Sequence, residues 1–131
     1  MSIDETGRQF VVASTDRDFA RLLCQALAPA GVASAVSSSS DLFSRTHAMR
    51  PAAIVLEPEL FGLGGDAACK NLRALDSTKL IPAIFILRSE EDVHQLASFR
   101  PERDRFLVKP FRLEAFEQAL DEVLVVAEPA D

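Results

Sequence analysis

The sequence predicts an α/β fold, an open parallel β-sheet with helices on both faces, built as one domain of 131 residues. The main observation is a series of short apolar runs at near-regular intervals, at residues 10–13, 32–36, 53–56, 83–87 and 106–108. Four of the five runs are continuously apolar, which is typical of parallel strands covered on both faces. Segments with helical spacing separate the runs, and this alternation of strand and helix predicts a parallel sheet.

The first two helices and the second strand follow from local patterns. A helical stripe of apolar side chains precedes Gly31 and consists of Phe19, Leu22, Leu23, Ala26 and Leu27. The run at 32–36 is interrupted by Ser34, so we expect this strand at an edge of the sheet. The four serines at 37–40 are interpreted as a loop before the second helix, 41–50, with Asp41 as its N-cap and Pro51 after its end.

Three further helices are predicted over 66–75, 89–99 and 112–127. The helix at 89–99 has a capping-box-like start, Ser89 followed by Asp92, and must end near Pro101. The last helix is strongly amphipathic, and its apolar stripe contains Leu113, Phe116, Leu120, Val123 and Leu124.

Composition narrows the classes of function. The net charge of −6 and the pI of about 4.9 argue against general binding of nucleic acid or anionic membranes, and favour protein partners. The N-terminus has no signal-peptide pattern, and no apolar run has the 18 or so residues that span a bilayer. We therefore expect a cytoplasmic protein without membrane insertion, in which Cys24 and Cys69 are unpaired thiols.

Binding sites of open α/β sheets lie beyond the carboxyl ends of the strands. The residues at those positions are Ser14 and Thr15 after the first run, Glu57 after the third, Leu87 at the end of the fourth and Lys109 after the fifth. Glu57 and Lys109 are the opposite charges among them. The spacing predicts that they converge as a lysine–carboxylate pair.

Several short motifs resemble the receiver domain of two-component response regulators. They are the Lys-Pro of 105-RFLVKPF-111, the strand and carboxylate of 51-PAAIVLE-57, Gly62 and Gly65 after it, Pro82 before the fourth run, and the helix start at 18–23. The resemblance covers about residues 9–126, leaving 1–8 as an N-terminal tail and 127–131 as a C-terminal tail or linker stub. It implies a flavodoxin-like, doubly wound five-stranded sheet of order 2-1-3-4-5 with five helices, and a cis bond before Pro110.

The same resemblance shows where this sequence departs from the family. The family's phosphoacceptor is an Asp after strand three, and Glu57 stands there; its Mg²⁺-binding acids after strand one are here Ser14 and Thr15. A Ser or Thr that contacts the phosphate at the end of strand four is replaced by Leu87. The aromatic switch position of strand five holds Phe106, which lacks a hydroxyl. Only Lys109 is unchanged.

These departures remove groups that the family uses to bind Mg²⁺ and to accept a phosphoryl group. Mg²⁺ prefers carboxylate oxygens in near-octahedral geometry, so we expect its binding to be lost or weak, with no other cofactor. Asp16 and Glu59 together with Glu57 are the carboxylates that could form a substitute site. Because Glu57 is one methylene longer than Asp, its oxygens are displaced, and a displacement of about 1 Å can cost about 10²-fold in rate. We predict no catalysis.

Two interpretations of Glu57 follow. In the preferred interpretation, Glu57 pairs with Lys109 and neutralises its charge. The pair then takes the place of the charge balance that is centred on a metal ion in the family's pocket. In the other interpretation, Glu57 imitates the phosphorylated residue and holds the domain permanently in its active state. Glu57 carries one negative charge, however, whereas a phosphate carries about 1.5 to 2.

The function predicted is that of a phosphorylation-independent pseudo-receiver that acts by protein–protein contact in bacterial signalling. Its working surface, and the candidate homodimer interface, would be helix four, strand five and helix five. Phe106 belongs to this face, and Arg100, Arg103 and Arg105 with Arg88 form a basic patch there that is either a docking surface or a solvated rim. The alternatives are a receiver still regulated by phosphorylation and a small-ligand binder that uses the modified crevice.

Overall fold

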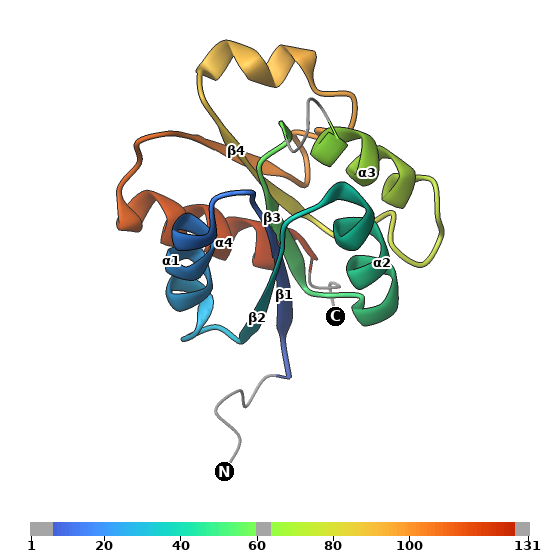
Figure 1. The fold of residues 1–131 in the computed structure, drawn as a ribbon, viewed down its shortest axis with the longest axis horizontal. Helices are drawn as coiled ribbons and strands as arrows, with labels where there is room; N and C mark the ends of the chain where they lie inside the picture. Colours follow the sequence, from blue (N-terminus) through green and yellow to red (C-terminus); the bar gives the residue numbers. More distant parts are fainter. Residues whose placement is uncertain (1–6, 60–63, 128–131) are drawn as a thin grey trace.

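The computed structural model describes residues 7–59 and 64–127. Its strands are β1 (Gln9–Ala13), β2 (Val32–Val36), β3 (Ala53–Leu56), β4 (Ala83–Leu87) and β5 (Arg105–Val108). They form one parallel sheet in the order β2-β1-β3-β4-β5. Helices α1 (Arg17–Leu27) and α4 (Leu113–Ala127) cover one face, and α2 (Ser39–Met49) and α3 (Gly64–Arg73) cover the other (Figure 1). The predicted fold class and the strand order implied by the resemblance are confirmed.

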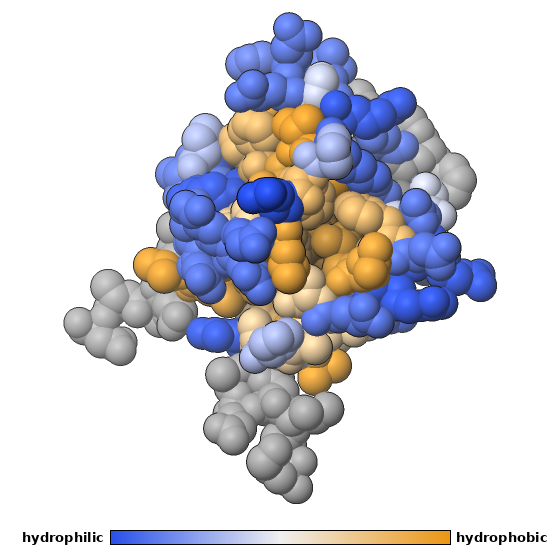
Figure 2. Space-filling view, turned by 90° about the vertical axis from the view of Figure 1, so that its left-hand side faces the viewer, coloured by the Kyte–Doolittle hydropathy of each residue, from blue (hydrophilic) through white to orange (hydrophobic). Residues whose placement is uncertain are grey.

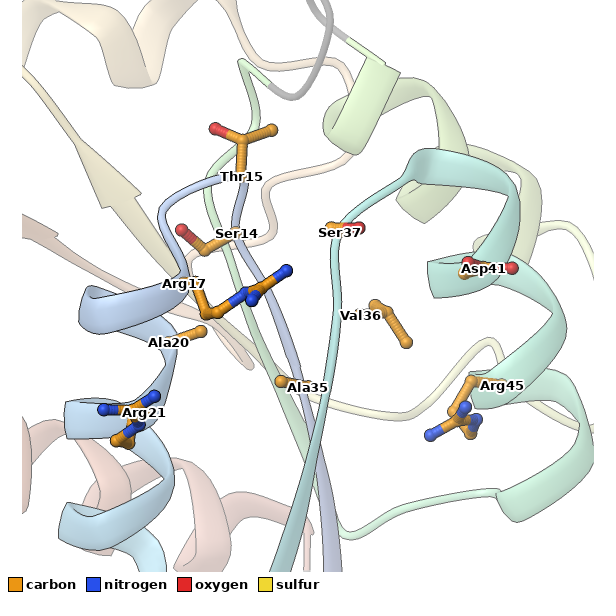
Figure 3. Close-up of a pocket in the computed structure, with 10 residues that line it drawn as sticks. All are labelled: Ser14, Thr15, Arg17, Ala20, Arg21, Ala35, Val36, Ser37, Asp41 and Arg45. Carbon is orange, nitrogen blue, oxygen red and sulfur yellow. The ribbon is translucent and has the colours of Figure 1, made fainter.

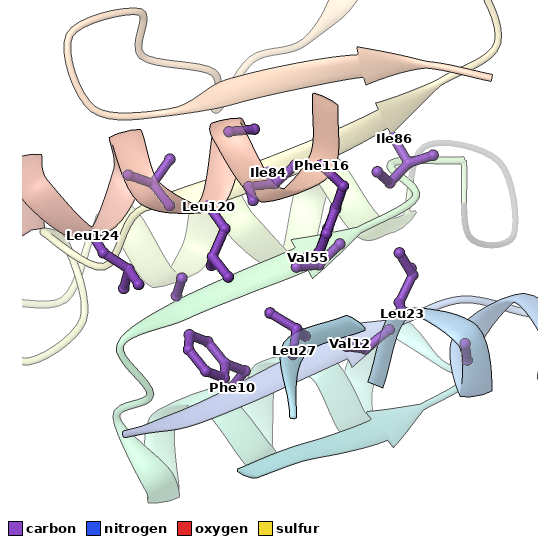
Figure 4. Close-up of a cluster of buried hydrophobic side chains, with 14 residues drawn as sticks. Phe10, Val12, Leu23, Leu27, Val55, Ile84, Ile86, Phe116, Leu120 and Leu124 are labelled. Atoms are coloured by element: carbon purple, nitrogen blue, oxygen red, sulfur yellow. The ribbon is translucent and has the colours of Figure 1, made fainter. Parts of the chain in front are cut away.

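The core consists of two apolar layers, because successive side chains of a strand point to opposite faces of the sheet. Phe10 and Val12 of β1 pack with α1 and α4 (Figure 4), whereas Val11 and Ala13 pack with α2 and α3. All the side chains of β3 and β4 are buried. Each buried Val, Leu, Ile or Phe contributes about 1.5–3 kcal/mol from the removal of apolar area from water.

The two edges of the sheet differ from its centre. Strand β2 is an edge, as Ser34 led us to expect, and Val36 is its one buried residue. Strand β5 forms the opposite edge, and its four residues are all half-buried. Both edge strands therefore leave part of their surface available for contacts.

Side-chain caps fix the starts of α1 and α2. Asp16 caps α1 by accepting a hydrogen bond from the Phe19 N–H at 3.1 Å. The prediction that Asp41 caps α2 is wrong, because Ser38 is the N-cap and accepts from the Asp41 N–H at 3.1 Å. The serine stretch is therefore the start of a helix rather than a loop before one. Among the described helices, none combines the length and the apolar character needed to cross a membrane.

The fourth predicted helix is the main error in the expected fold. The structure has a short 3-10 helix, η1 (Glu90–Gln95), and an irregular segment from Leu96 to Asp104. Ser89 forms no side-chain cap, so the capping-box pattern does not lead to an α-helix. Tertiary contacts with α3 hold the segment instead. The Asp66 carboxylate accepts hydrogen bonds from the N–H groups of Ala97 (2.9 Å) and Ser98 (3.1 Å) and from the Ser98 hydroxyl (2.5 Å).

A buried ion pair holds the other end of this irregular segment. Arg73 Nη2 donates to both carboxylate oxygens of Asp104, at 2.7 and 2.6 Å, and the two side chains are 4% and 0% exposed. Asp104 also accepts from the N–H groups of Ala83 and Arg100, each at 2.9 Å. Nothing in the local sequence indicated this pair, because its members are 31 positions apart.

Candidate functional site at the carboxyl ends of the strands

The candidate site is built from residues that continue the strand hydrogen bonding past the strand ends. Ser14 N–H donates to Val36 O at 3.1 Å, Glu57 N–H to Ala13 O at 3.1 Å, and Lys109 N–H to Leu87 O at 2.9 Å. Because parallel strands end at the same edge of the sheet, these bonds bring Ser14, Glu57 and Lys109 together. The backbone hydrogen bonding of the sheet thus holds these three residues at one edge, independently of their side-chain contacts.

The Glu57 carboxylate lies between Lys109 and Ser14. One oxygen accepts from the Lys109 ammonium and the other from the Ser14 hydroxyl. The Glu57 side chain is 12% exposed and that of Lys109 is 35% exposed, so the pair is shielded on the carboxylate side. The Lys109 ammonium also lies 4.3 Å from the ring centroid of Phe19, a favourable cation–π contact. The predicted lysine–carboxylate pair is present.

The backbone around this pair has two special features. The peptide bond between Lys109 and Pro110 is cis, the isomer that the resemblance implies. A Cβ on Gly65 would lie 2.6 Å from the carbonyl oxygen of Glu57, so glycine lets α3 approach the Glu57–Pro58 segment. Gly65 belongs to α3 rather than to the expected loop, and Gly62 lies outside the described residues.

The two residues expected after β1 have different surroundings. Ser14 is 2% exposed, accepts from the Asp16 N–H at 3.0 Å and donates to Glu57. Thr15 is exposed, and it lines a groove between α1 and α2 instead of contacting the carboxylate. The structure therefore brings one of the two hydroxyls into the site.

Of the other expected positions, one is apolar and the two carboxylates have partners other than the Glu57–Lys109 pair. Leu87 is fully buried in the apolar layer under α2 and α3. Asp16 is engaged as the cap of α1, and Glu59 pairs with Arg88 at 3.0 Å. Within residues 7–59 and 64–127, no group of three or more His, Cys, Asp or Glu side chains is arranged to hold a metal ion.

Phe106 is packed into the second apolar layer by other aromatic rings. Its ring meets that of Phe99 edge-on at a centroid distance of 5.9 Å, and Phe99 meets Phe85 in the same way at 5.6 Å. These rings connect β5, the irregular segment after η1 and β4. The half-buried Phe106 therefore lies beneath the surface that sequence analysis assigned to output.

Arg88 lies apart from Arg105, another member of the predicted basic patch. Ile84 is paired in register with Arg105 and Leu87 with Val108, so Arg105 lies at the amino end of the sheet and Arg88 beyond its carboxyl end. At about 3.3 Å per residue, these positions are about 13 Å apart along the strands. Arg105 pairs with Glu122 of α4 at 2.8 Å, and Arg103 donates to the Leu80 carbonyl at 3.3 Å. The prediction grouped Arg88 with Arg105 because both flank predicted strands in the sequence, but the two residues lie at opposite ends of those strands.

An apolar groove beside the Glu57–Lys109 pair was not predicted from the sequence. Figure 2 shows an apolar hollow surrounded by hydrophilic side chains, and the groove has a volume of about 400 Å³. Its walls come from α1, the segment after β5 and the start of α4; exposed apolar side chains at its rim include Leu22 (61%) and Leu113 (55%). Both leucines were interpreted only as members of helical core stripes.

Comparison with known proteins supports the fold assignment. No family model matches the sequence, and no curated protein matches it. Among solved structures, the receiver domain of a sensor histidine kinase from Pseudomonas aeruginosa, crystallised with a magnesium ion coordinated in its active-site cleft, is similar with a TM-score of 0.78 and 17% identity. The similarity covers 92% of this chain and 99% of that one.

Two further structures extend this result. A response-regulator receiver domain from Methylobacillus flagellatus has a TM-score of 0.73 at 21% identity, covering 88% of this chain and 98% of that chain. A two-component response regulator from Clostridium difficile has a TM-score of 0.75 at 20% identity, covering 90% and 96%. The chain thus has the CheY-like fold of the receiver domains of two-component signalling.

Proposed function

We propose that this chain is a phosphorylation-independent pseudo-receiver that acts through protein–protein contact in bacterial signalling. The observation that carries the proposal is the closed contact of Glu57 with Lys109 and Ser14. Both carboxylate oxygens of Glu57 already accept hydrogen bonds, and Glu57 stands at the position of the family's phosphoacceptor. Attack by either oxygen on a phosphoryl donor would weaken its hydrogen bond to Lys109 or Ser14, because the attacking oxygen loses negative charge.

Apart from Lys109, the described surroundings of Glu57 offer few of the groups that stabilise phosphoryl transfer. Such transfer depends on metal ions and donors that neutralise charge on the transferred group. Ser14 and Thr15 supply neutral hydroxyls, and Leu87 supplies no donor. We expect Mg²⁺ binding to be lost or weak, and we expect the chain not to be an enzyme.

Incubation with acetyl phosphate and Mg²⁺, followed by intact-mass measurement, tests this proposal. We expect no gain in mass. A gain of about 80 Da, the mass of one phosphoryl group, at Glu57 would establish the alternative of a receiver that is still phosphorylated. Peptide mapping assigns any added group to Glu57 rather than to one of the exposed serines.

The mimic interpretation of Glu57 makes a different prediction for partner binding. If the charge of Glu57 holds an active state, Glu57→Gln abolishes partner binding in a folded protein. If Glu57 is structural, the variant loses stability but binds its partner with unchanged affinity below its unfolding temperature. We favour the structural role because one carboxylate, already bound by Lys109 and Ser14, cannot supply the three oxygens of a phosphate.

The proposed working surface is the face formed by η1, β5 and α4. Its support is the half-buried edge strand β5 and the exposed Arg100 in the segment before it. A pull-down with wild-type protein, Arg103→Glu and the control Arg45→Glu, an exposed arginine on α2 and outside this face, tests the assignment. A partner lost with Arg103→Glu alone supports this surface, whereas equal retention by both variants contradicts it.

A further inference from the structure

A second cavity lies at the open edge of the sheet, between the start of α1 and the start of α2. Its volume is about 560 Å³, and it is lined by Ser14, Thr15, Arg17, Ala20, Arg21, Ala35, Val36, Ser37, Asp41 and Arg45 (Figure 3). This volume is within the range of about 300–1,000 Å³ that is typical of small-molecule sites. The cavity is separate from the apolar groove between α1 and α4.

The cavity is cationic within an acidic protein. Three arginines line it against the single acid Asp41, although the chain as a whole carries a net charge of −6. Arg17 and Arg45 extend toward β2 from opposite sides, one from α1 and the other from α2 (Figure 3). Neither guanidinium group has a hydrogen-bonding or ion-pair partner among the described residues, and that of Arg21 has only a 4.0 Å contact with Asp18. The guanidinium groups are therefore available to a ligand.

The floor of the cavity combines apolar side chains with unpaired backbone groups. Ala20, Ala35 and Val36 supply the apolar contacts. The N–H of Val32 and the C=O of Val36 form hydrogen bonds on the side of β2 that faces β1. In a parallel strand, the backbone N–H and C=O groups of successive residues point to alternate sides. Those of Ala35 therefore point away from the sheet. The hydroxyls of Thr15 and Ser37, both exposed residues, lie at the same cavity.

We propose that this cavity binds a phosphate-bearing small molecule of about nucleotide size. Planar guanidinium groups match phosphate oxygens in bidentate geometry, which makes arginine the side chain best suited to this group. The phosphate would lie between Arg17 and Arg45, and the apolar part of the ligand would cover Ala35 and Val36. This site is distinct from Glu57 and does not depend on the proposed pseudo-receiver function.

The shape of the cavity favours a compact ligand over an acidic peptide added to the sheet. A peptide that extends the sheet would pair along the whole edge strand, Val32–Val36. The cavity is lined by Ala35, Val36 and Ser37 but not by Val32 or Ala33. The positive charge of the cavity is therefore concentrated beside the carboxyl end of β2.

Titration of the ¹⁵N-labelled chain with AMP, and separately with inorganic pyrophosphate, tests the proposal. We expect saturable shifts of the Ala35 and Ser37 amide resonances with both probes and none with adenosine. Arg17→Gln and Arg45→Gln should each weaken AMP binding by about tenfold or more, because each removes a charge-assisted hydrogen-bond donor. Arg112→Gln, the same charge change outside the cavity, should leave the affinity unchanged. Both cavity arginines are exposed, so circular dichroism should show folded variants.

Three results would overturn the proposal. The first is the absence of saturable shifts with either phosphate probe. The second is equal weakening by Arg112→Gln, which would indicate nonspecific attraction. The third is a stronger response to a tetraglutamate peptide, with shifts along all of Val32–Val36, which would assign the edge to an acidic peptide. None of these results affects the acetyl phosphate test at Glu57.

Discussion

Glu57 and Lys109, which are 52 positions apart in the sequence, form a direct ion pair at the carboxyl edge of the sheet. Glu57 is nearly shielded from water and Lys109 is about one-third exposed, so the pair is intermediate between surface and buried salt bridges. We expect Glu57→Gln to destabilise the fold by about 1–3 kcal/mol, since it removes the counter-charge of Lys109. Chemical denaturation measures this loss.

A double-mutant cycle separates the pair from its surroundings. If the two side chains stabilise each other, Glu57→Gln combined with Lys109→Met should cost less than the sum of the single changes. Strict additivity would show that the contact has no energetic role. Glu114→Gln, an exposed acid on α4, is the matched control and should change stability by less than about 0.5 kcal/mol.

The Arg73–Asp104 pair should be more sensitive, because both side chains are almost fully buried. Asp104→Ala leaves a buried guanidinium without a counter-charge and the N–H of Ala83 without an acceptor. We expect a loss of about 3–5 kcal/mol in the free energy of unfolding. Asp76→Ala removes an exposed partner of Lys79 and should have little effect; equal losses for the two variants would contradict the buried role.

Asp66 should control the order of the irregular segment after η1. Asp66→Ala removes the acceptor of three hydrogen bonds from Ala97 and Ser98, and we expect it to cost about 2–3 kcal/mol. Hydrogen exchange should accelerate at Ala97 and Ser98 well before it accelerates at the amides of β3. Unchanged protection of these two amides would show that the segment is held by its apolar contacts alone.

The two cysteines should react at different rates with a thiol reagent. Both are free, and burial raises the pKa of each thiol, so the reactive thiolate is scarce at neutral pH. Cys69 is 1% exposed whereas Cys24 is half-buried, so access favours Cys24. We expect native-state labelling of Cys24 first, with Cys69 labelled only on unfolding. Mass mapping of the labelled peptides checks the order, and equal rates in the native state would contradict the packing around Cys69.

The strands were predictable because their signal is local. Runs such as 83–87 carry enough adjacent apolar residues to identify a buried strand, and the observed β4 has the same bounds. The Glu57–Lys109 pair was predictable for a related reason, since both residues follow such runs and parallel strands end at one edge. The geometry of a parallel sheet thus predicts that these two residues, distant in sequence, lie close together in space.

The segment between β4 and β5 was not predictable, because distant residues determine its structure. Its Ser89–Asp92 pattern suggested a capped helix, but the chain is instead held by Asp66 and by Arg73, neither of which has a local signal. The arginine cavity was missed for the same reason. Arg17 and Arg45 lie on helices that cover opposite faces of the sheet, and both line the cavity beside the edge strand β2.

The chain has the receiver fold, and we propose that it does not carry out phosphoryl transfer at Glu57. The most direct measurement is the intact mass of two proteins after incubation with acetyl phosphate and Mg²⁺. One is the wild type, and the other carries Ser14→Asp, Thr15→Asp, Glu57→Asp and Leu87→Thr. We predict no change for the wild type and a gain of about 80 Da, at position 57, for the folded variant. A gain of that mass at Glu57 of the wild type would contradict the account.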